Sequence, residues 1–346
     1  MNNSLLNRIK MAGKTLLYGR RLENTRTEIP ALTADELAEI RQFFPRDKFF
    51  IFGHARSGTT LLARLIRLHP QVHCNYQAHF FTRAPLLQSL VDRPVIESWL
   101  ARRSNRWNHG RDLSPVVLRA AADIILEREA LALNKSIVGD KSPNSLLNGQ
   151  SVRLMHNVYP DARLIYILRD GRDTAVSHRF QAFIDSPQHL TAEDLRLREA
   201  FARDPEPFMN GTRSVFTEKA IRTAAESWVT NLLETDQEGQ RLYGERYRSL
   251  RYEDLLREPY PQMQHLWDFL GAEPQVADLE SAVAEAMGEN PDADWQQQKA
   301  EEIASPLQKG QHGSWRELFN ARDRQVFKTI AGETLIQWGY ERDLSW

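Results

Sequence analysis

The stretch Lys48-Phe-Phe-Ile-Phe-Gly-His-Ala-Arg-Ser-Gly-Thr-Thr60, with the leucine-rich run after it, decides the fold of this 346-residue chain. Residues 48–53 are apolar enough to predict a short buried strand, and residues 59–68 carry apolar side chains at helical spacing. Between them, Gly53 and Gly58 stand five residues apart in a polar turn. This is the spacing of a phosphate-binding loop, in which backbone N–H groups and the helix dipole attract an anion.

The same order of apolar run, polar cluster and helical run recurs three times along the chain. We expect strands at residues 136–139, 163–168 and 246–250, each followed by a polar cluster. Strands that alternate with helices predict βαβ units, a central parallel sheet and a three-layer α/β/α fold like that of P-loop nucleotide-binding proteins. Ligands of such sheets bind beyond the carboxyl ends of the strands, so the polar clusters should meet at one edge.

The remaining segments predict one large domain with helical additions. Thr33 and Glu36 form a capping box for a helix to about residue 43, and Ser114-Pro115 starts a helix to about residue 131. Further helices are expected at residues 216–238 and 321–338, a surface excursion at 185–213 and a mobile polar segment at 289–312. We predict a helical N-terminal extension over residues 1–45 and one domain over 46–346, with helical insertions at about residues 80–132 and 184–240.

The composition excludes some classes of protein. Hydrophobic residues make up 41% of the chain, and the net charge is −1, so the whole chain has no general attraction for nucleic acid. A basic stripe interleaved with aromatic residues, the usual mark of a nucleic-acid partner, is missing as well. The single cysteine, Cys74, cannot form an intrachain disulfide, which fits a reducing compartment, and we expect a cytoplasmic protein.

The N-terminal segment is basic and apolar in alternation. Five basic residues precede the first acidic residue, Glu23, and leucines and isoleucine lie between them (Arg8, Lys10, Lys14, Arg20 and Arg21; Leu5, Leu6, Ile9, Leu16 and Leu17). Two interpretations stay open: a basic amphipathic helix that makes a weak membrane-surface contact, or a frayed, loosely docked helix.

The phosphate loop lacks the lysine of an ATPase. That lysine follows the second glycine, where this chain has Thr59, and it normally serves the β- and γ-phosphates of a nucleoside triphosphate. Its loss favours another anion and a site without metal. The run Arg56-Ser57-Gly58-Thr59-Thr60-Leu61 resembles the 5′-phosphosulfate loop of sulfotransferases that use 3′-phosphoadenosine-5′-phosphosulfate (PAPS).

Three later clusters resemble other parts of that family. The run Arg169-Asp-Gly-Arg-Asp-Thr-Ala-Val-Ser177 is similar to the 3′-phosphate segment, in which the Arg and the Ser bind the phosphate. Lys309-Gly310 and the following Gly-Ser-Trp315 resemble the C-terminal segment that closes over this phosphate, with Gln308 and Ser314 in place of Arg and Asp. Tyr252 stands where tyrosylprotein sulfotransferases carry a tyrosine near the adenine. Trp228 is a weaker candidate for nucleotide contact, because a tryptophan on an amphipathic helix is more often part of the core.

The resemblance implies the sulfotransferase fold and in-line transfer of a sulfonate group from PAPS to an acceptor hydroxyl, with 3′,5′-bisphosphoadenosine (PAP) as product. Arg56 and Lys141 would stabilise the leaving group, while Thr59, Thr60 and the backbone amides hold the phosphosulfate. No metal is expected.

The general base is the weakest part of this prediction. The run Gln77-Ala-His79-Phe-Phe81 resembles the Glu-x-His-Phe-Phe of heparan-sulfate 3-O-sulfotransferases, in which the Glu is the base. Neutral Gln77 cannot accept the proton. His79 is therefore the predicted base, with His54 and Asp140 as reserves.

Two alternatives and the identity of the acceptor stay open. The first alternative is a P-loop kinase that uses ATP–Mg²⁺, with Val138-Gly-Asp140 as the end of a metal-binding strand. The second is a non-catalytic nucleotide-binding module on the same fold. The acceptor can be a small molecule, a glycan or a peptide tyrosine, and its pocket is expected in the variable segments 85–112 and 185–213. The arginines near Trp99 and Trp107 fit either an anionic or sugar acceptor or a solvated basic face.

Overall fold

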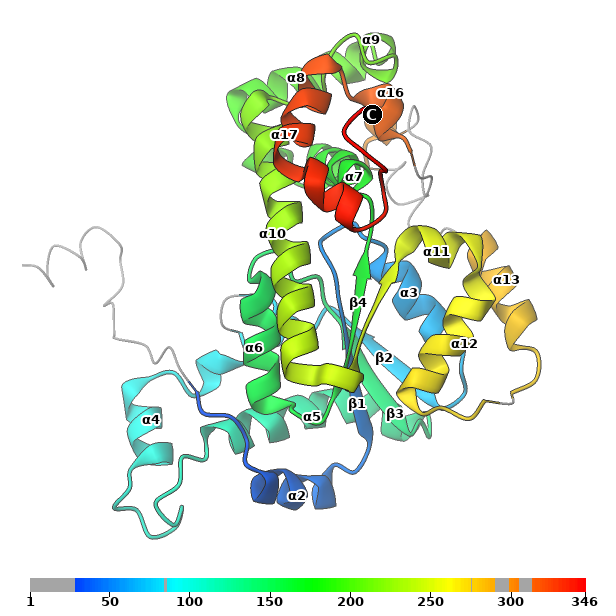
Figure 1. Ribbon diagram of the computed structural model, residues 1–346. Coiled ribbons are helices and arrows are strands. Elements are labelled where there is room, and N and C mark those ends of the chain that lie inside the picture. Colours follow the sequence, from blue (N-terminus) through cyan, green and yellow to red (C-terminus); the bar gives the residue numbers. More distant parts are fainter. Residues whose placement is uncertain (1–28, 84–85, 275, 290–298, 305–312) are drawn as a thin grey trace, which may run out of the picture.

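The centre of the molecule is a five-stranded, all-parallel β-sheet (Figure 1). The computed structural model describes residues 29–83, 86–274, 276–289, 299–304 and 313–346. The strand order is β2-β3-β1-β4-β5, so the chain passes from β1 to the edge strand β2, returns to place β3 between them, and then builds outward on the other side through β4 and β5. The strands are β1 (Asp47–Phe52), β2 (Val72–Tyr76), β3 (Ile137–Lys141), β4 (Arg163–Leu168) and β5 (Tyr247–Arg251).

Both faces of the sheet are buried, which confirms the three-layer α/β/α prediction. Along β1, Phe50 and Phe52 belong to one hydrophobic core, while Phe49 and Ile51 belong to the other. Successive side chains of a strand point to opposite faces. A strand that is buried on both faces therefore reads as a continuous apolar run, as residues 48–52 do.

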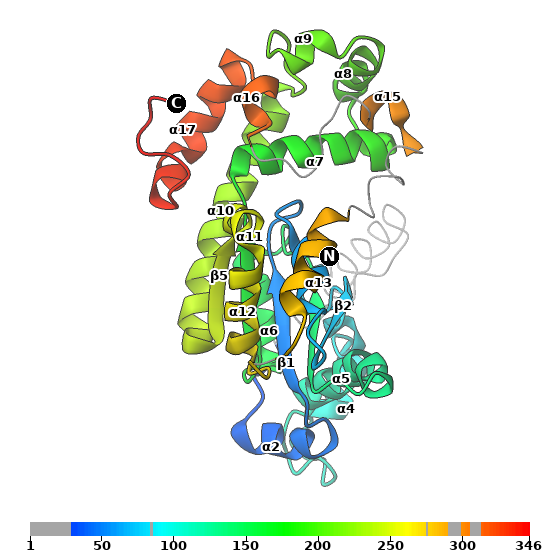
Figure 2. The ribbon, with the colours of Figure 1, turned by 90° about the vertical axis from the view of Figure 1, so that its right-hand side faces the viewer.

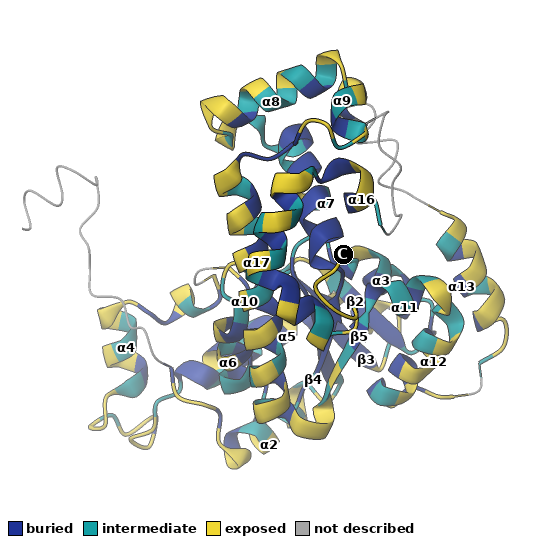
Figure 3. Ribbon diagram, turned by 45° about the horizontal axis from the view of Figure 1, so that its top comes forward, coloured by how far each residue is buried: buried dark blue, intermediate teal, exposed yellow. Residues whose placement is uncertain are grey.

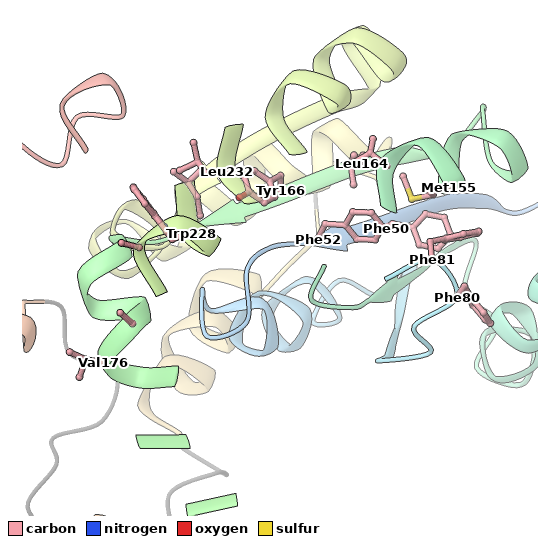
Figure 4. Packing of buried hydrophobic residues seen from close by; sticks show 14 of the residues in the cluster. Phe50, Phe52, Phe80, Phe81, Met155, Leu164, Tyr166, Val176, Trp228 and Leu232 are labelled. Carbon is pink, nitrogen blue, oxygen red and sulfur yellow. The ribbon is translucent and has the colours of Figure 1, made fainter. Parts of the chain in front are cut away.

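Helices cover the two faces unequally. The larger core lies beneath α5 (Ser114–Ala132), α6 (Asn148–Val158) and α10 (Glu218–Tyr243), where β-sheet aromatics such as Phe50 and Tyr166 lie near Met155 and Leu232 (Figure 4). The smaller core lies beneath α3 (Thr59–Ile66), α12 (Pro259–Leu270) and α13 (Leu279–Gly288). Buried positions concentrate on the strands and the inner sides of these helices (Figure 3).

A second group of helices stands beyond the carboxyl ends of the strands. Helix α7 (Gly171–Asp185) crosses above this edge of the sheet (Figure 2). The other helices of this group are α8 (Ala192–Arg203), α9 (Glu206–Met209), α15 (Glu301–Ala304), α16 (Trp315–Leu318) and α17 (Ala321–Gln337).

Three short helices complete the described chain. Helix α11 (Tyr252–Arg257) follows β5 directly, while α2 (Ala34–Phe43) and α4 (Pro94–Ala101) lie toward the amino ends of the strands (Figure 1). The capping box of Thr33 and Glu36 is present at the start of α2, as predicted. None of the helices in the described ranges is long and apolar enough to cross a bilayer. Residues 1–28, on which the predicted N-terminal helix and its membrane contact depend, lie outside the described chain.

The structure corrects two local predictions, and it shows the helices of the segment 185–213, which was expected as a surface excursion within a helical insertion. Strand β2 was not expected, because His73 and Asn75 interrupt its apolar pattern. Asp140 and Lys141 are the last two residues of β3 and do not follow the strand as predicted. Residues 185–213 contain helices α8 and α9. The division into an extension, one domain and two insertions stays a prediction.

Candidate active site

The glycine-bounded loop between β1 and α3 is held by polar side chains that follow β3. The Gly53 amide donates to Oδ1 of Asn144 (3.2 Å), and the Ala55 amide donates to Oγ of Ser145 (2.8 Å). The amides in the first turn of α3, from Thr59 to Leu61, have no intrahelical acceptor. They are therefore available to an anion at this helix N-terminus. The Leu61 side chain is partly buried against the smaller core, so its contribution to such a site is its amide.

Two residues of this loop have left-handed backbone conformations. Arg56 has φ of 74° and Gly58 has φ of 91°. A Cβ at Gly58 would lie 2.2 Å from Cδ2 of Tyr252, so the tyrosine ring lies directly against the loop backbone. A glycine is required here both by its φ and by this contact. Ser57 between them is buried, and its Oγ has no hydrogen-bond partner in the described chain.

Side chains from three elements meet beside the loop. Arg169, directly after β4, donates from Nη1 to the Arg56 carbonyl (3.2 Å), and its guanidinium lies 4.9 Å from the centre of the Tyr252 ring. Arg56 donates from Nε to Oγ of Ser177 on α7 (3.1 Å). The sequence required α7 to fold back beside the end of β4 if Arg169 and Ser177 were to share a site. The structure has this arrangement and adds Arg56 and Tyr252 to it.

Helix α7 also anchors the C-terminal cluster. The Asp173 carboxylate accepts hydrogen bonds from the Gly313 amide (2.6 Å), the Ser314 hydroxyl (3.0 Å) and the Trp315 amide (3.2 Å). Lys309 and Gly310, the predicted phosphate-binding residues of this cluster, lie outside the described residues. Hydrogen bonds therefore fix Gly313, Ser314 and Trp315 to α7, the helix that also carries Ser177.

Lys141 reaches the loop from the neighbouring strand. Its side chain is buried at the end of β3, and Nζ donates to Oγ1 of Thr60 (3.1 Å). Nζ also lies 5.3 Å from the centre of the Tyr76 ring. The second predicted cation therefore lies beside the helix N-terminus on the opposite side of the sheet centre from Arg169, because β3 and β4 flank β1.

The predicted base lies in a turn that follows β2. Gln77 and His79 both have positive φ, 56° and 53°. Three hydrogen bonds to β3 and the residue after it hold the turn: the Gln77 amide to the Lys141 carbonyl (2.7 Å), the Ala78 amide to Oδ1 of Asp140 (3.0 Å) and the His79 amide to Oγ of Ser142 (3.0 Å). Gln77 is exposed, whereas His79 is buried.

The imidazole of His79 is neutral at physiological pH. Burial and the nearby charges of Arg83 and Lys141 lower the pKa of His79 to about 4. Nδ1 lies 2.7 Å from Oγ1 of Thr82, while Nε2 is buried without a hydrogen-bond partner among the described residues. In the tautomer in which Nδ1 carries the hydrogen and donates it to Thr82, Nε2 is the proton acceptor of this neutral imidazole.

The two reserve candidates have other engagements. His54 contacts the Ala55 carbonyl through Nδ1 (2.9 Å) and Oγ of Ser227 through Nε2 (3.0 Å), and burial lowers its pKa to about 4. Asp140 accepts from Ser142 (2.6 Å) as well as from Ala78, and burial raises its pKa to about 6. Both side chains are engaged in hydrogen bonds within the protein, so His79 stays the better candidate for the general base.

Comparison with known proteins identifies the family. The model of the sulfotransferase domain matches residues 46–339, which is most of the chain. The chain belongs to the sulfotransferase domain family. The kinase alternative therefore finds no support, in line with Thr59 at the position of the kinase lysine.

Individual relatives of the sulfotransferase are distant. An uncharacterized protein of Aquifex aeolicus is 28% identical over 136 residues, which are 39% of this chain and 17% of that protein, so the match spans a small part of the relative's length. Mouse sulfotransferase SULT7A1, solved in complex with PAP, is 17% identical, with 90% of this chain and 92% of that chain covered at a TM-score of 0.46. Sulfotransferase STF9 of Mycobacterium avium is 14% identical, with 87% and 81% covered at a TM-score of 0.44.

Sequence reasoning missed the residues that position the candidate site. Asn144 and Ser145 hold the loop, Ser142 holds the turn of His79, and Asp173 holds the C-terminal cluster. Each stands within or directly after a polar cluster that the sequence had marked at a strand end, and this was the available signal. Trp228 proves to be a core residue, with Nε1 donating to the Arg169 carbonyl (3.0 Å).

Within the described ranges, no three His, Cys, Asp or Glu side chains lie close enough together to hold a metal ion.

Proposed function

We propose that this sulfotransferase takes its sulfonate group from PAPS and transfers it to a hydroxyl of an acceptor molecule. The observation that carries the proposal is the convergence of Arg56, Arg169, Ser177 and Tyr252 beside the phosphate loop. The loop and the N-terminus of α3 fit the 5′-phosphosulfate end of PAPS. The second group of donors, on β4 and α7, fits a further phosphate, which PAPS has at its 3′ position.

The residues present fit this nucleotide in kind. Arginine offers a planar fork of donors to phosphate oxygens, and Ser57 Oγ is a buried polar atom without a hydrogen-bond partner among the residues that the structure describes. Tyr252 presents an aromatic ring between the loop and Arg169, where an adenosine could pack. PAPS itself supplies the activated sulfonate.

The chemistry needs two cations and a base, and the chain offers them around one loop. As the acceptor oxygen forms its bond to sulfur, the bond between sulfur and the 5′-phosphate oxygen breaks, and the electron pair stays on that oxygen. Arg56 and Lys141 stabilise this charge, and amides of the first turn of α3 hold the remaining oxygens. The hydroxyl proton passes to Nε2 of His79, provided that Nδ1 carries the hydrogen donated to Thr82.

Calorimetry tests the nucleotide half of the proposal. Wild-type protein should bind PAP without added metal and should bind ATP–Mg²⁺ far more weakly. Arg169→Ala and Ser177→Ala should each weaken PAP binding about tenfold or more, since a hydrogen bond to a charged group contributes roughly 1.5–3 kcal/mol. The matched control is Arg196→Ala, which removes an exposed arginine of α8. Equal affinity of Arg169→Ala and the control for PAP would exclude the assigned 3′-phosphate site.

Turnover tests the transfer half. Labelled PAPS with a panel of phenols, sugars and peptides should give labelled product with at least one class, and PAP should accumulate with it. Exposed Gln77 in place of a glutamate favours one alternative, a nucleotide-binding module without activity. PAP binding together with no transfer to any acceptor of the panel would support that alternative and contradict the enzyme.

A further inference from the structure

An exposed apolar surface lies on α4 and the segments that flank it. Five large apolar side chains contribute to it (Leu86, Leu90, Val95, Trp99 and Trp107). Together with the exposed arginines of the same segment (Arg93, Arg102, Arg103, Arg106 and Arg111), they are called the α4 surface. Val95 is 71% exposed and Trp99 is 58% exposed, and the rings of Trp99 and Trp107 stack at 5.2 Å with 30° between their planes. Exposed apolar side chains of this size, gathered within one stretch of the chain, indicate an interaction site.

The same surface is strongly basic. Five arginines within residues 86–111 are exposed (Arg93, Arg102, Arg103, Arg106 and Arg111). All residues of this range are described, and none of its acidic side chains is exposed: Asp92 is buried and Glu97 is half-buried. Arg111 lies 3.9 Å from Glu36. This local charge contrasts with the net charge of −1 of the whole chain.

The segment after α4 presents these side chains from a well-held backbone. The buried Asn108 donates to the carbonyls of Leu100 (3.0 Å) and Arg102 (3.4 Å), and its Oδ1 accepts from the Gly110 amide (3.0 Å). Asn105 donates to the Trp99 carbonyl (2.9 Å). The exposure of the tryptophans therefore does not result from a loose loop. A folded loop holds them outward.

The α4 surface lies apart from the site of transfer. Helix α4 packs on α5 and lies low in Figure 1, near α2, whereas the loop and α7 lie at the carboxyl ends of the strands. Helix α4 therefore stands away from the phosphate loop, whereas the sequence had left an anionic or sugar acceptor open for the arginines of this segment.

We propose that the α4 surface docks on an anionic lipid bilayer. Tryptophan rings and arginines are the side chains that prefer the level of lipid head groups, and aliphatic side chains beside them enter the acyl boundary. Arginines next to a bilayer gain from the negative potential of acidic lipids. An anionic polysaccharide would also satisfy the arginines, but it gives no role to the exposed Leu86, Leu90 and Val95. The complementary charge and the aliphatic side chains together therefore favour lipid.

Vesicle co-sedimentation of the full chain tests the proposal. Vesicles of phosphatidylcholine with about one third phosphatidylserine should bind the protein, vesicles of phosphatidylcholine alone should not, and added salt should weaken binding. The charge variant Arg102→Gln/Arg106→Gln should lower the partition coefficient about 25-fold, at about fivefold per charge removed. The apolar variant Trp99→Ser/Trp107→Ser should lower it about tenfold.

Two controls separate this surface from the rest of the chain. Arg196→Gln/Arg203→Gln removes two exposed arginines of α8 at the other end of the molecule and should leave binding unchanged. The basic residues within 1–28 are identical in all variants, so vesicle binding that survives both α4-surface variants would overturn the proposal. Equal binding to uncharged vesicles would also overturn it, as would binding to heparin without binding to either kind of vesicle.

Discussion

Replacement of Gly58 by alanine tests the contact between the phosphate loop and Tyr252. The added Cβ would lie 2.2 Å from Cδ2 and 2.6 Å from Cε2 of the ring, at a residue whose φ is 91°. Neither atom is the flexible end of a side chain, because both belong to a rigid ring. The ring must therefore move away from the loop, or the loop must change its backbone conformation.

The size of the effect follows from two parts. A left-handed conformation costs a residue with a Cβ roughly 1–2 kcal/mol. Displacement of Tyr252 also disturbs its contact with Arg169, whose guanidinium lies 4.9 Å from the ring centre, and such contacts are worth about 0.5–2 kcal/mol. Gly58→Ala should therefore lose roughly 1.5–4 kcal/mol, summed over folding stability and nucleotide binding. If the loop of the free variant relaxes to relieve this strain, the free energy of unfolding falls less. The same strain then lowers the affinity for PAP, because nucleotide binding restores the original shape of the loop.

Two measurements together recover this energy: urea unfolding of the free protein and calorimetric binding of PAP. The matched control is Gly271→Ala, since Gly271 also has positive φ, 76°, but a Cβ there would meet its nearest atom at 3.5 Å. Measured against Tyr252→Ala, in which the ring is already absent, Gly58→Ala/Tyr252→Ala should show only the backbone part of the loss in stability. The reasoning is refuted if Gly58→Ala matches Gly271→Ala in stability and binds PAP as tightly as the wild type.

Three further predictions concern the turn of His79 and the C-terminal cluster. His79→Ala should lower kcat about 10²–10⁴-fold. The kcat of the wild type should stay level from neutral pH down to about pH 5 and fall only near pH 4, where His79 gains its proton. A His79-dependent fall of kcat near pH 6.5 would contradict this. Ser142→Ala removes the acceptor of the His79 amide and should lower kcat about tenfold with PAP affinity unchanged; an equal loss in PAP affinity would indicate general damage instead. Asp173→Asn should weaken PAP binding, measured by calorimetry, about tenfold. Ser314→Ala should weaken it less, because Asp173 accepts three hydrogen bonds and Ser314 donates one of them. Unchanged affinity of Asp173→Asn for PAP would show that these hydrogen bonds do not support the nucleotide site.

The parts of the fold that the sequence predicted are those whose signals are local. The apolar run of β1, the glycines of the loop and the leucines of α3 lie within some twenty consecutive residues, and the structure has them as predicted. Strand β2 lacks such a signal, because His73 is buried in it although it is polar. Its place at the edge of the sheet depends on its pairing with β3, which the pattern of residues 72–76 does not contain.

The parts of the site that the sequence missed depend on partners far along the chain. The conformations of Gln77 and His79 follow from hydrogen bonds to residues 140–142, and positive φ at two such residues has no signature in their identities. Asp173 stood within a motif that the sequence had marked, but its partners lie 140 to 142 residues away. The sequence could predict that polar residues at the strand ends form the site. It could not predict which of these strand ends lie next to one another.

The replacement of a glutamate by Gln77 is less damaging to the proposed transfer than the sequence alone suggests. With a pKa of about 4, His79 is about as basic as an ordinary glutamate, whose pKa is about 4.3. The two groups differ in charge instead. A glutamate beside Lys141 and Arg83 would offset their positive charge, whereas a neutral imidazole leaves the full field of Lys141 to act on the leaving oxygen. Burial, Arg83 and Lys141 together lower the pKa of His79, and of these Lys141 also serves the proposed reaction. A weak neutral base is the form of base that this site can hold without weakening the field of Lys141.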